Sequence, residues 1–152
     1  MWRGYAYGKV SNINILTVEE ILQRVCHGAM RVANERKCDC PDFGISYGLR
    51  TAKHQFRLFK SGRSLVGSKW VITDKSKVIT YCDGYIKLST HQTGLAIDFF
   101  AIGVNGIADF SPSSMALVAT CFFESASNEG VDIDWGGSFK SISDTGHIEV
   151  IS

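Results

Sequence analysis

Residues 95–102 read LAIDFFAI, an apolar run that is interrupted by a single charge, Asp98. A continuous apolar run of this length is typical of a strand that is buried on both faces. Burying a carboxylate in such a strand costs free energy unless the carboxylate is paired or bound to a cation. The sequence therefore predicts a central strand and a partner for Asp98.

A histidine precedes this aspartate on the other side of a glycine. Residues 89–98 read STHQTGLAID, so that Gly94 lies between His91 and Asp98. Glycine permits the tight turn that would bring the imidazole back towards the strand. An imidazole and a carboxylate that converge from a turn and a strand can supply two of the three protein ligands of a catalytic zinc ion. His91 and Asp98 are therefore candidate metal ligands.

A second histidine motif, DTGHIE, occupies residues 144–149. His147 is the candidate third ligand, which would leave one coordination position of the metal for water. Zinc lowers the pKa of such a water to about 7, and Asp144 is placed to take its proton and pass it to a leaving amine. Glu149 shares a strand face with His147 by alternation, so it is a candidate support for that ligand.

An arginine upstream of these motifs could complete the site. Residues 48–51 read GLRT, and a fixed Arg50 guanidinium could hold a substrate carboxylate or stabilise the oxyanion that forms on attack. Ser89 and Trp135 are further candidates for supporting a ligand or contacting substrate, although a tryptophan more often serves packing. His54 matches no motif, and we expect it at the edge of the core or on the surface.

The rest of the chain mixes helices and strands without a regular strand–helix–strand rhythm, which favours an α+β fold. Thr17 and Glu20 have the spacing of a capping box, and Pro112 suits the first position of a helix. The β-rich runs at 70–73 and 78–81 indicate a hairpin or an ordered excursion at about 68–88. The expected elements are helices at 18–34, 51–60 and 112 to about 130, and strands at 43–49, 95–102, 131–135 and 147–151.

Composition constrains the function less tightly. The 152 residues, 45% of them hydrophobic, fit one domain that spans 1–152. The net charge of +1 provides no global field that would recruit nucleic acid or a membrane. No apolar run is long enough for a membrane span, and no secretion signal is apparent, so we expect neither membrane insertion nor export. The odd count of five cysteines indicates free thiols, and nothing indicates a dimer, so we expect a monomer.

In order and spacing these motifs resemble the M15 peptidase family, which includes D-Ala-D-Ala peptidases of the VanX and VanY types and the phage L-alanyl-D-glutamate endopeptidases called endolysins. Residues 89–98 are similar to the family signature S-x-H-x-x-G-x-A-x-D, and Asp144-x-x-His147 is similar to its second motif. Residues 48–51 resemble the G-[ILY]-R-[ST] segment that carries the active-site arginine. Residues 134–137, DWGG, resemble a W-G-G stretch that is common in the endolysin-like members.

The resemblance implies the small α+β fold shared with Hedgehog-type signalling domains, a short antiparallel sheet flanked by helices. It implies that His91, Asp98 and His147 bind Zn²⁺, that Asp144 is the base, and that Arg50 faces a peptidoglycan stem peptide. The compact size and the aspartate base favour an L-alanyl-D-glutamate endopeptidase. Such an endolysin would stay in the host cytoplasm until another protein released it to the cell wall.

Two alternatives stay open. The same ligands would serve a D-Ala-D-Ala carboxypeptidase or dipeptidase, which must recognise a free terminal carboxylate. A zinc-containing cell-wall binding module without catalysis would share the fold, but Asp144 argues against it, because a binder needs no base beside the metal. The excursion at about 68–88 departs from the shortest members of the family and leaves the scissile bond open.

Overall fold

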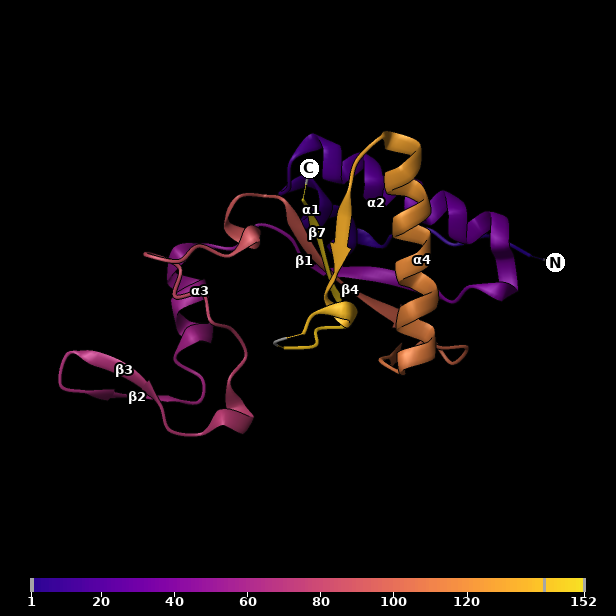
Figure 1. The fold of residues 1–152 in the computed structure, drawn as a ribbon. Coiled ribbons are helices and arrows are strands. Elements are labelled where there is room, and N and C mark those ends of the chain that lie inside the picture. The colour runs from indigo at the N-terminus through magenta and orange to yellow at the C-terminus, as the bar shows by residue number, and fades with distance from the viewer. Residues whose placement is uncertain (1, 141, 152) are drawn as a thin grey trace.

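The computed structural model describes residues 2–140 and 142–151. An antiparallel sheet of five strands organises the fold (Figure 1). Its order is β1 (Asp42–Tyr47), β4 (Ala96–Ile102), β7 (His147–Val150) and β6 (Ile133–Trp135), and β5 (Ala108–Asp109) pairs with the end of β4. The predicted α+β class and the predicted antiparallel sheet are confirmed.

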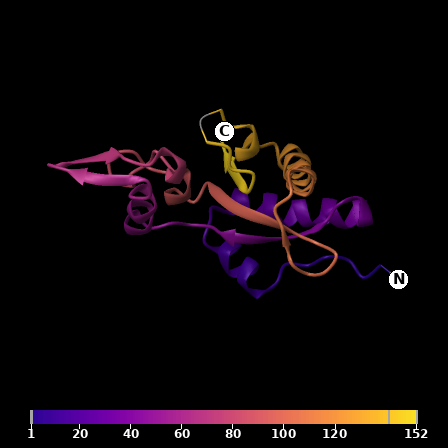
Figure 2. The ribbon, with the colours of Figure 1, turned by 90° about the horizontal axis from the view of Figure 1, so that it is seen from below.

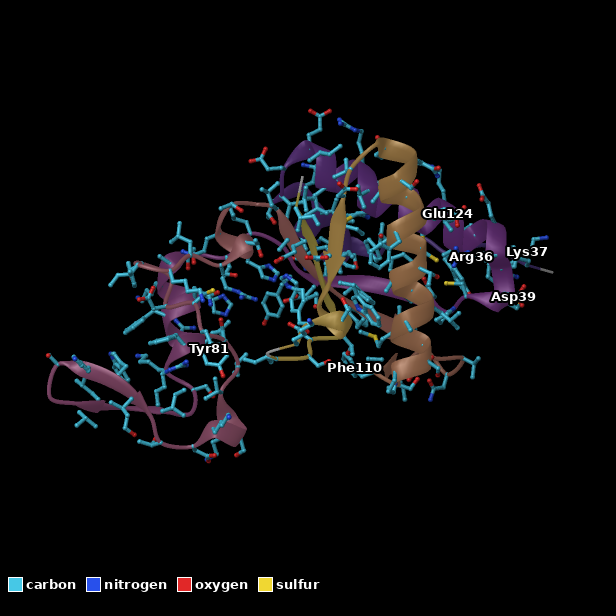
Figure 3. The ribbon with its side chains drawn as sticks, in the orientation of Figure 1. Arg36, Lys37, Asp39, Tyr81, Phe110 and Glu124 are labelled. Carbon is cyan, nitrogen blue, oxygen red and sulfur yellow. The ribbon has the colours of Figure 1, made fainter. Side chains whose placement is uncertain are left out.

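Helices enclose the core together with the sheet. They are α1 (Lys9–Leu16), α2 (Glu20–Arg36), α3 (Ala52–Phe59) and α4 (Pro112–Glu129) within the described residues. The two longest, α2 and α4, pack against each other, and Arg36 of α2 pairs with Glu124 of α4 at an Nη2–Oε2 distance of 2.6 Å (Figure 3). The fully buried side chains Leu22, Phe43 and Phe122 fill the space between helices and sheet.

Strand β4 departs from the predicted burial on both faces. Ile97, Phe99 and Ala101 are buried against the helices, whereas the alternate residues Asp98 and Phe100 are only partly buried. The second face is covered only in part, by α1, whose Ser11 side chain lies against the Gly44–Phe100 pair. This half-open face allows Asp98 to reach a cavity.

The helix ends correct one expectation and confirm another. The capping box at Thr17 does not form, because α2 begins at Glu20 and has no side-chain cap. Thr17 instead donates to the Asn14 carbonyl at 2.6 Å and accepts from the Leu49 N–H at 2.9 Å, and so it joins α1 to the end of β1. Pro112 does begin α4, which ends at Gly130 in the left-handed conformation (φ 71°), where glycine is favoured.

Residues 51–88, called the arm below, project from this body (Figures 1 and 2). The arm contains α3 and a hairpin of β2 (Arg63–Val66) and β3 (Lys69–Ile72). The hairpin therefore lies earlier than the predicted one at about 68–88, and 78–81 lies outside any strand. Gly67 (φ 62°) permits the tight turn through which β3 pairs with β2, the strand that precedes it in the sequence. Asp74 then caps a 3-10 turn that follows the end of β3.

Two further expectations concern cysteines and membranes. All five cysteines are free, as the odd count indicated. Among the described residues, no helix combines the length and the apolar character needed to cross a membrane.

Candidate metal centre and active-site cavity

Two backbone features bring the predicted metal ligands together. Antiparallel pairing of β4 with β7 sets Asp98 directly opposite His147. His91 lies just before β4 in a 3-10 turn, η3 (Thr90–Gln92), which has a true capping box. There the Ser89 hydroxyl accepts from the His91 N–H at 3.3 Å, and the Gln92 side chain accepts from the Ser89 N–H at 3.0 Å. Ser89 therefore fixes the turn that carries His91.

The three candidate ligand atoms form a nearly equilateral triangle. His91 Nε2 lies 3.1 Å from Asp98 Oδ1 and 3.2 Å from His147 Nδ1, and His147 Nδ1 lies 3.4 Å from Asp98 Oδ1. Ligand atoms about 2.0–2.1 Å from a tetrahedral zinc ion lie roughly 3.3–3.4 Å apart. The triangle thus has the size of one face of a zinc coordination tetrahedron, and these residues form a group that could hold a metal ion.

The outer nitrogen of each imidazole already has an acceptor. His91 Nδ1 lies 2.9 Å from the Gly48 carbonyl oxygen, and His147 Nε2 lies 2.8 Å from Glu149 Oε2. A carbonyl and a carboxylate can only accept, so each imidazole donates outwards and its inner nitrogen presents a lone pair. Two lone pairs and a carboxylate oxygen at these distances repel one another unless a cation or a proton lies between them. The donor set therefore fits a metal ion.

Protons compete for the same position. Burial lowers the pKa of His147, but hydrogen bonds with Asp98 and Glu149 outweigh burial and raise the pKa to about 9. Burial raises the pKa of Asp98, yet hydrogen bonds from His147 and His91 outweigh burial and hold this pKa well below its usual range. Because a metal ligand must be deprotonated, metal binding at His147 and protonation of its Nδ1 exclude each other.

Glu149 contacts the candidate ligand that the strand alternation assigned to it. Its Oε2 accepts from the Thr90 hydroxyl at 2.6 Å as well as from His147. The hydrogen bond with His147 is the main reason that the pKa of Glu149 is lowered. One carboxylate thus ties η3 to β7, the two elements that carry the histidines.

Arg50 lies beside the triangle and is held from two sides. Its Nη2 lies 3.4 Å from Asp98 Oδ2, and its Nη1 donates to Gln55 Oε1 at 2.9 Å. The Arg50 Nε is buried and has no hydrogen-bond partner among the described residues. The two oxygens of Asp98 therefore have different partners, because Oδ1 belongs to the triangle and Oδ2 faces the guanidinium.

A cavity of about 440 Å³ opens onto the triangle. Asp144 lines it, and its loop is held by bonds from the Asp144 N–H to the Gly136 carbonyl (2.9 Å) and from the His147 N–H to the Asp144 carbonyl (3.1 Å). The structure therefore places Arg50 and Asp144 at the same cavity as the three candidate ligands. The cavity is lined by ligands, loop and arm together, among them Arg50, His54, Tyr81, Lys87, Phe139 and Asp144.

Comparison with known proteins adds two findings. Residues 84–150 match the peptidase M15 family model described as D-alanyl-D-alanine carboxypeptidase. The fold matches a crystal structure of the Serratia marcescens L-Ala D-Glu endopeptidase ChiX, with a TM-score of 0.68 and 23% identity, over 96% of this chain and 90% of that chain. Both findings support the M15 peptidase family. No curated protein sequence gives a significant match.

The M15 match covers the segment that carries most of the candidate site. Residues 84–150 contain all three candidate ligands and Asp144, whereas Arg50 and most of the arm lie outside the matched range. At 23% identity, the likeness to the endopeptidase shows that the two proteins share a fold.

Trp135 does not line the cavity. Its Nε1 donates to the Thr145 carbonyl at 2.8 Å, and its ring packs against the core. Trp135 therefore positions the loop next to Asp144, and its candidacy as a substrate contact finds no support in its location. Phe139 lies nearer, with its ring 5.6 Å from that of His147.

His54 is a cavity residue that no M15 motif indicated. Thr51 caps α3 by accepting from the His54 N–H at 3.1 Å, and this first turn directs the imidazole towards Tyr47, with the ring centroids 5.9 Å apart. Burial, followed by the charge of Arg50, lowers the pKa of His54. The available signal was the helix start at Thr51, which places His54 one turn beyond Arg50.

Proposed function

We propose that this chain is a zinc-dependent peptidase that hydrolyses peptide bonds in peptidoglycan, with His91, Asp98 and His147 as the zinc ligands. The observation that carries the proposal is the triangle of inward-facing acceptors, in which both imidazoles already donate outwards. The M15 family match supports a peptidase, and the cavity beside the triangle provides space for a peptide.

The chemistry that zinc supplies when bound is polarisation of a scissile carbonyl and acidification of water to a pKa of about 7. Asp144 would accept a proton from the attacking water and deliver it to the leaving amine. The backbone bonds of its loop keep this carboxylate at the cavity wall, within three residues of His147. Asp144 can therefore serve as the base without a large movement of the chain.

Arg50 would provide a fixed positive charge at the cavity. Its two terminal nitrogens are held by Gln55 and Asp98, so the guanidinium plane cannot rotate freely. A preorganised donor of this kind stabilises negative charge better than a mobile one, because no reorganisation accompanies the reaction. We assign to Arg50 the binding of a substrate carboxylate or of the charge that develops on attack.

Within peptidoglycan, we propose cleavage between L-Ala and D-Glu of the stem peptide by a monomeric, endolysin-type enzyme that is released from the host cytoplasm to the cell wall. The aspartate base and the fold shared with an L-Ala D-Glu endopeptidase support this choice. The basic side chains of Arg50 and Lys87 line the cavity and complement the carboxylates of a stem peptide.

The test is a mass-spectrometric inventory of the fragments released from Gram-negative peptidoglycan by purified protein. The same digestion is repeated after chelation and after zinc is added back. New ends between L-Ala and D-Glu that disappear on chelation and return with zinc are the expected result. If zinc-loaded protein releases no fragment from any type of peptidoglycan, the peptidase proposal fails and a zinc-containing binding module is favoured.

A D-Ala-D-Ala carboxypeptidase is the second candidate, because the matching family model carries that description. Such an enzyme needs the free carboxylate at the end of the stem peptide. Release of terminal D-Ala alone, with loss of activity on end-blocked peptides, would favour it over the endopeptidase.

A further inference from the structure

The arm has a charge that the whole chain conceals. Residues 51–88 contain eight Lys and Arg and two Asp, a net charge of +6, whereas the remaining residues contain eight basic and thirteen acidic side chains, a net charge of −5. Seven of the eight basic residues of the arm are exposed: Lys53, Arg57, Lys60, Lys69, Lys75, Lys77 and Lys87. The charge of +1 for the whole chain is therefore the sum of a strongly basic arm and an acidic body.

The same arm exposes apolar side chains and lacks a core of its own. Its only two buried residues are Gln55 and Gly84, and both are without an apolar side chain. The large apolar residues that stand exposed along it are Leu65, Val66, Val71, Ile72, Ile79, Tyr81, Tyr85, Ile86 and Leu88. Clustering of this many exposed apolar groups among cations marks an interaction surface.

The apolar groups are presented on ordered backbone. In the hairpin, Leu65 pairs with Trp70 and Val66 pairs with Lys69, so that aliphatic, aromatic and cationic side chains lie across from one another. In the turn at residues 83–87, Asp83 Oδ1 accepts from the N–H groups of Tyr85, Ile86 and Lys87 at 2.9 Å each. In this turn Ile86 is 94% exposed. Such a surface loses little conformational freedom when it binds.

Aromatic contacts join the hairpin and the turn at residues 83–87 into one surface. The Phe56 ring of α3 lies 5.8 Å from both the Trp70 ring and the Tyr85 ring. The Lys60 ammonium lies over Phe56 and Trp70, at 5.3 and 5.9 Å from the ring centroids. Aromatic rings beside lysines and exposed aliphatic groups are the combination found at membrane interfaces.

We propose that the arm is a docking surface for an anionic phospholipid bilayer, with the lysines on the headgroups and the aliphatic side chains at the boundary with the acyl chains. Charge complementarity alone would also suit nucleic acid. The exposed Leu, Val and Ile residues favour a lipid bilayer over nucleic acid, because a phosphate backbone offers no apolar region to cover them. The acidic body would be repelled from the same surface, so docking would be oriented.

Most of this surface is separate from the proposed chemistry, although Ile79, Tyr81 and Lys87 also line the cavity. The side chains of Leu65, Val66, Lys69, Lys75 and Lys77 do not line the cavity. Substituting them therefore tests docking without touching the candidate catalytic groups, and lipid binding can succeed or fail whatever bond the site cleaves.

The experiment is co-sedimentation of the full chain with vesicles of phosphatidylglycerol and phosphatidylcholine, and with vesicles of phosphatidylcholine alone. We expect binding to the anionic vesicles that weakens as salt is added. The triple variant Lys69→Gln, Lys75→Gln, Lys77→Gln should lower the partition coefficient on the order of a hundredfold, since each lysine near the surface contributes to it. The double variant Leu65→Ser, Val66→Ser should lower it by about tenfold or more.

Matched variants on the body serve as controls. The triple Arg3→Gln, Lys9→Gln, Arg31→Gln removes the same charge from exposed positions, and Val10→Ser, Leu16→Ser removes exposed apolar groups from α1. Both should bind vesicles as the unmodified chain does, and circular dichroism should show all variants folded.

Three outcomes would overturn the proposal: no binding to anionic vesicles, equal losses from the arm and body variants, or duplex DNA or purified sacculi bound more tightly than vesicles with no effect of Leu65→Ser, Val66→Ser. Hydrolysis of a soluble stem-peptide fragment, measured on the same variants, should stay unchanged. A failure of the peptidase proposal would thereby be distinguished from a failure of docking.

Discussion

Asp98 on β4 lies directly opposite His147 on β7, with its Oδ1 3.4 Å from His147 Nδ1 and its Oδ2 3.4 Å from the Arg50 guanidinium. A single carboxylate therefore contacts both the candidate metal position and the candidate substrate-binding cation. Any replacement of Asp98 should disturb both, and this relationship decides the first prediction.

Asp98→Asn should abolish tight zinc binding. The amide keeps the shape of the side chain but lacks the negative charge that the triangle and Arg50 both use, so we expect zinc affinity to fall by more than about a hundredfold. The measurement is competition of purified protein with a zinc chelator. Asp39→Asn, at an exposed position away from the cavity, is the control and should bind zinc normally. Normal affinity in Asp98→Asn would remove Asp98 from the ligand set.

Glu149→Gln should lower the zinc affinity without abolishing zinc binding. A glutamine can still accept from the His147 Nε2–H, but it no longer supplies a carboxylate, so zinc affinity should fall by about 10–100-fold. The same competition assay measures this change. Glu20→Gln on α2, where the side chain is 84% exposed, is the matched control. No change in Glu149→Gln would show that the Glu149–His147 contact contributes only to local structure.

Zinc binding near neutral pH should release a proton from His147, whose pKa is raised to about 9 without metal. Affinity should therefore increase with pH up to about 9 and then level off. Calorimetry in two buffers with different ionisation enthalpies measures the proton count. A count of zero at pH 7.5 would contradict the competition between metal and proton.

The same linkage fixes the sign of a stability change in chelated protein. A raised pKa means that His147 contributes stability fully below its unfolded pKa of about 6.5 and loses this contribution as the pH rises through about 9. The lowered pKa of Asp98 acts in the opposite direction, so that its contribution is lost under acid conditions. Chelated protein should therefore unfold at lower urea concentration at pH 9.5 than at pH 6, and zinc should reduce this difference.

Asp144→Ala should separate catalysis from metal binding. The side chain lies at the cavity wall, and its only hydrogen bond within residues 2–140 and 142–151 is a 3.3 Å contact from the Gly146 N–H to Oδ1, so its loss should leave the ligands in place. We expect turnover to fall by about 10²–10⁴-fold, the usual contribution of a general base, with zinc content unchanged. Full turnover in this variant would remove Asp144 from its proposed role.

Gly28→Ala should destabilise the fold although alanine favours helices. The Ser125 hydroxyl of α4 donates to the Val25 carbonyl at 2.7 Å, and a Cβ on Gly28 would overlap with that hydroxyl. Helix propensity would gain up to about 1 kcal/mol, but overpacking between helices costs about 1–3 kcal/mol. Urea denaturation should therefore show a lower free energy of unfolding.

Two further variants test the cause of the expected loss of stability in Gly28→Ala. Adding Ser125→Ala to Gly28→Ala removes the overlapping hydroxyl and should recover part of the stability. Gly8→Ala, where a Cβ would meet no atom within 4 Å, should be nearly neutral. A Gly28→Ala variant more stable than the unmodified chain would contradict the close helix contact.

The sequence motifs were sufficient to predict that the three candidate ligands lie together, and the reason is physical. His91, Asp98 and His147 lie on a turn and on strands whose patterns are local, and a costly buried carboxylate demands a partner. The register that sets Asp98 against His147 could not be derived, because it depends on contacts between segments far apart in sequence. The second face of β4 looked buried for the same reason, since an apolar run does not reveal what covers it.

The arm was the hardest part to predict. Its β-rich run at 70–73 could pair with the segment that follows it or with the segment that precedes it. Gly67, with its positive φ, allows the turn that pairs it with the preceding strand β2. Helix α1 was missed because its sequence, KVSNINIL, has no clear apolar stripe. His54 was missed because its place in the cavity results from the direction of α3 and not from any motif.

Gln55 gives the cavity a property that its lining alone does not reveal. This buried amide accepts from Arg50 and donates to the Cys82 carbonyl at 2.9 Å, so it bridges two residues that line the cavity. One side chain thereby connects Arg50 to the segment that carries Cys82. Shortening that side chain to asparagine would break this connection, and the Arg50 guanidinium would then be held by Asp98 alone among its described partners.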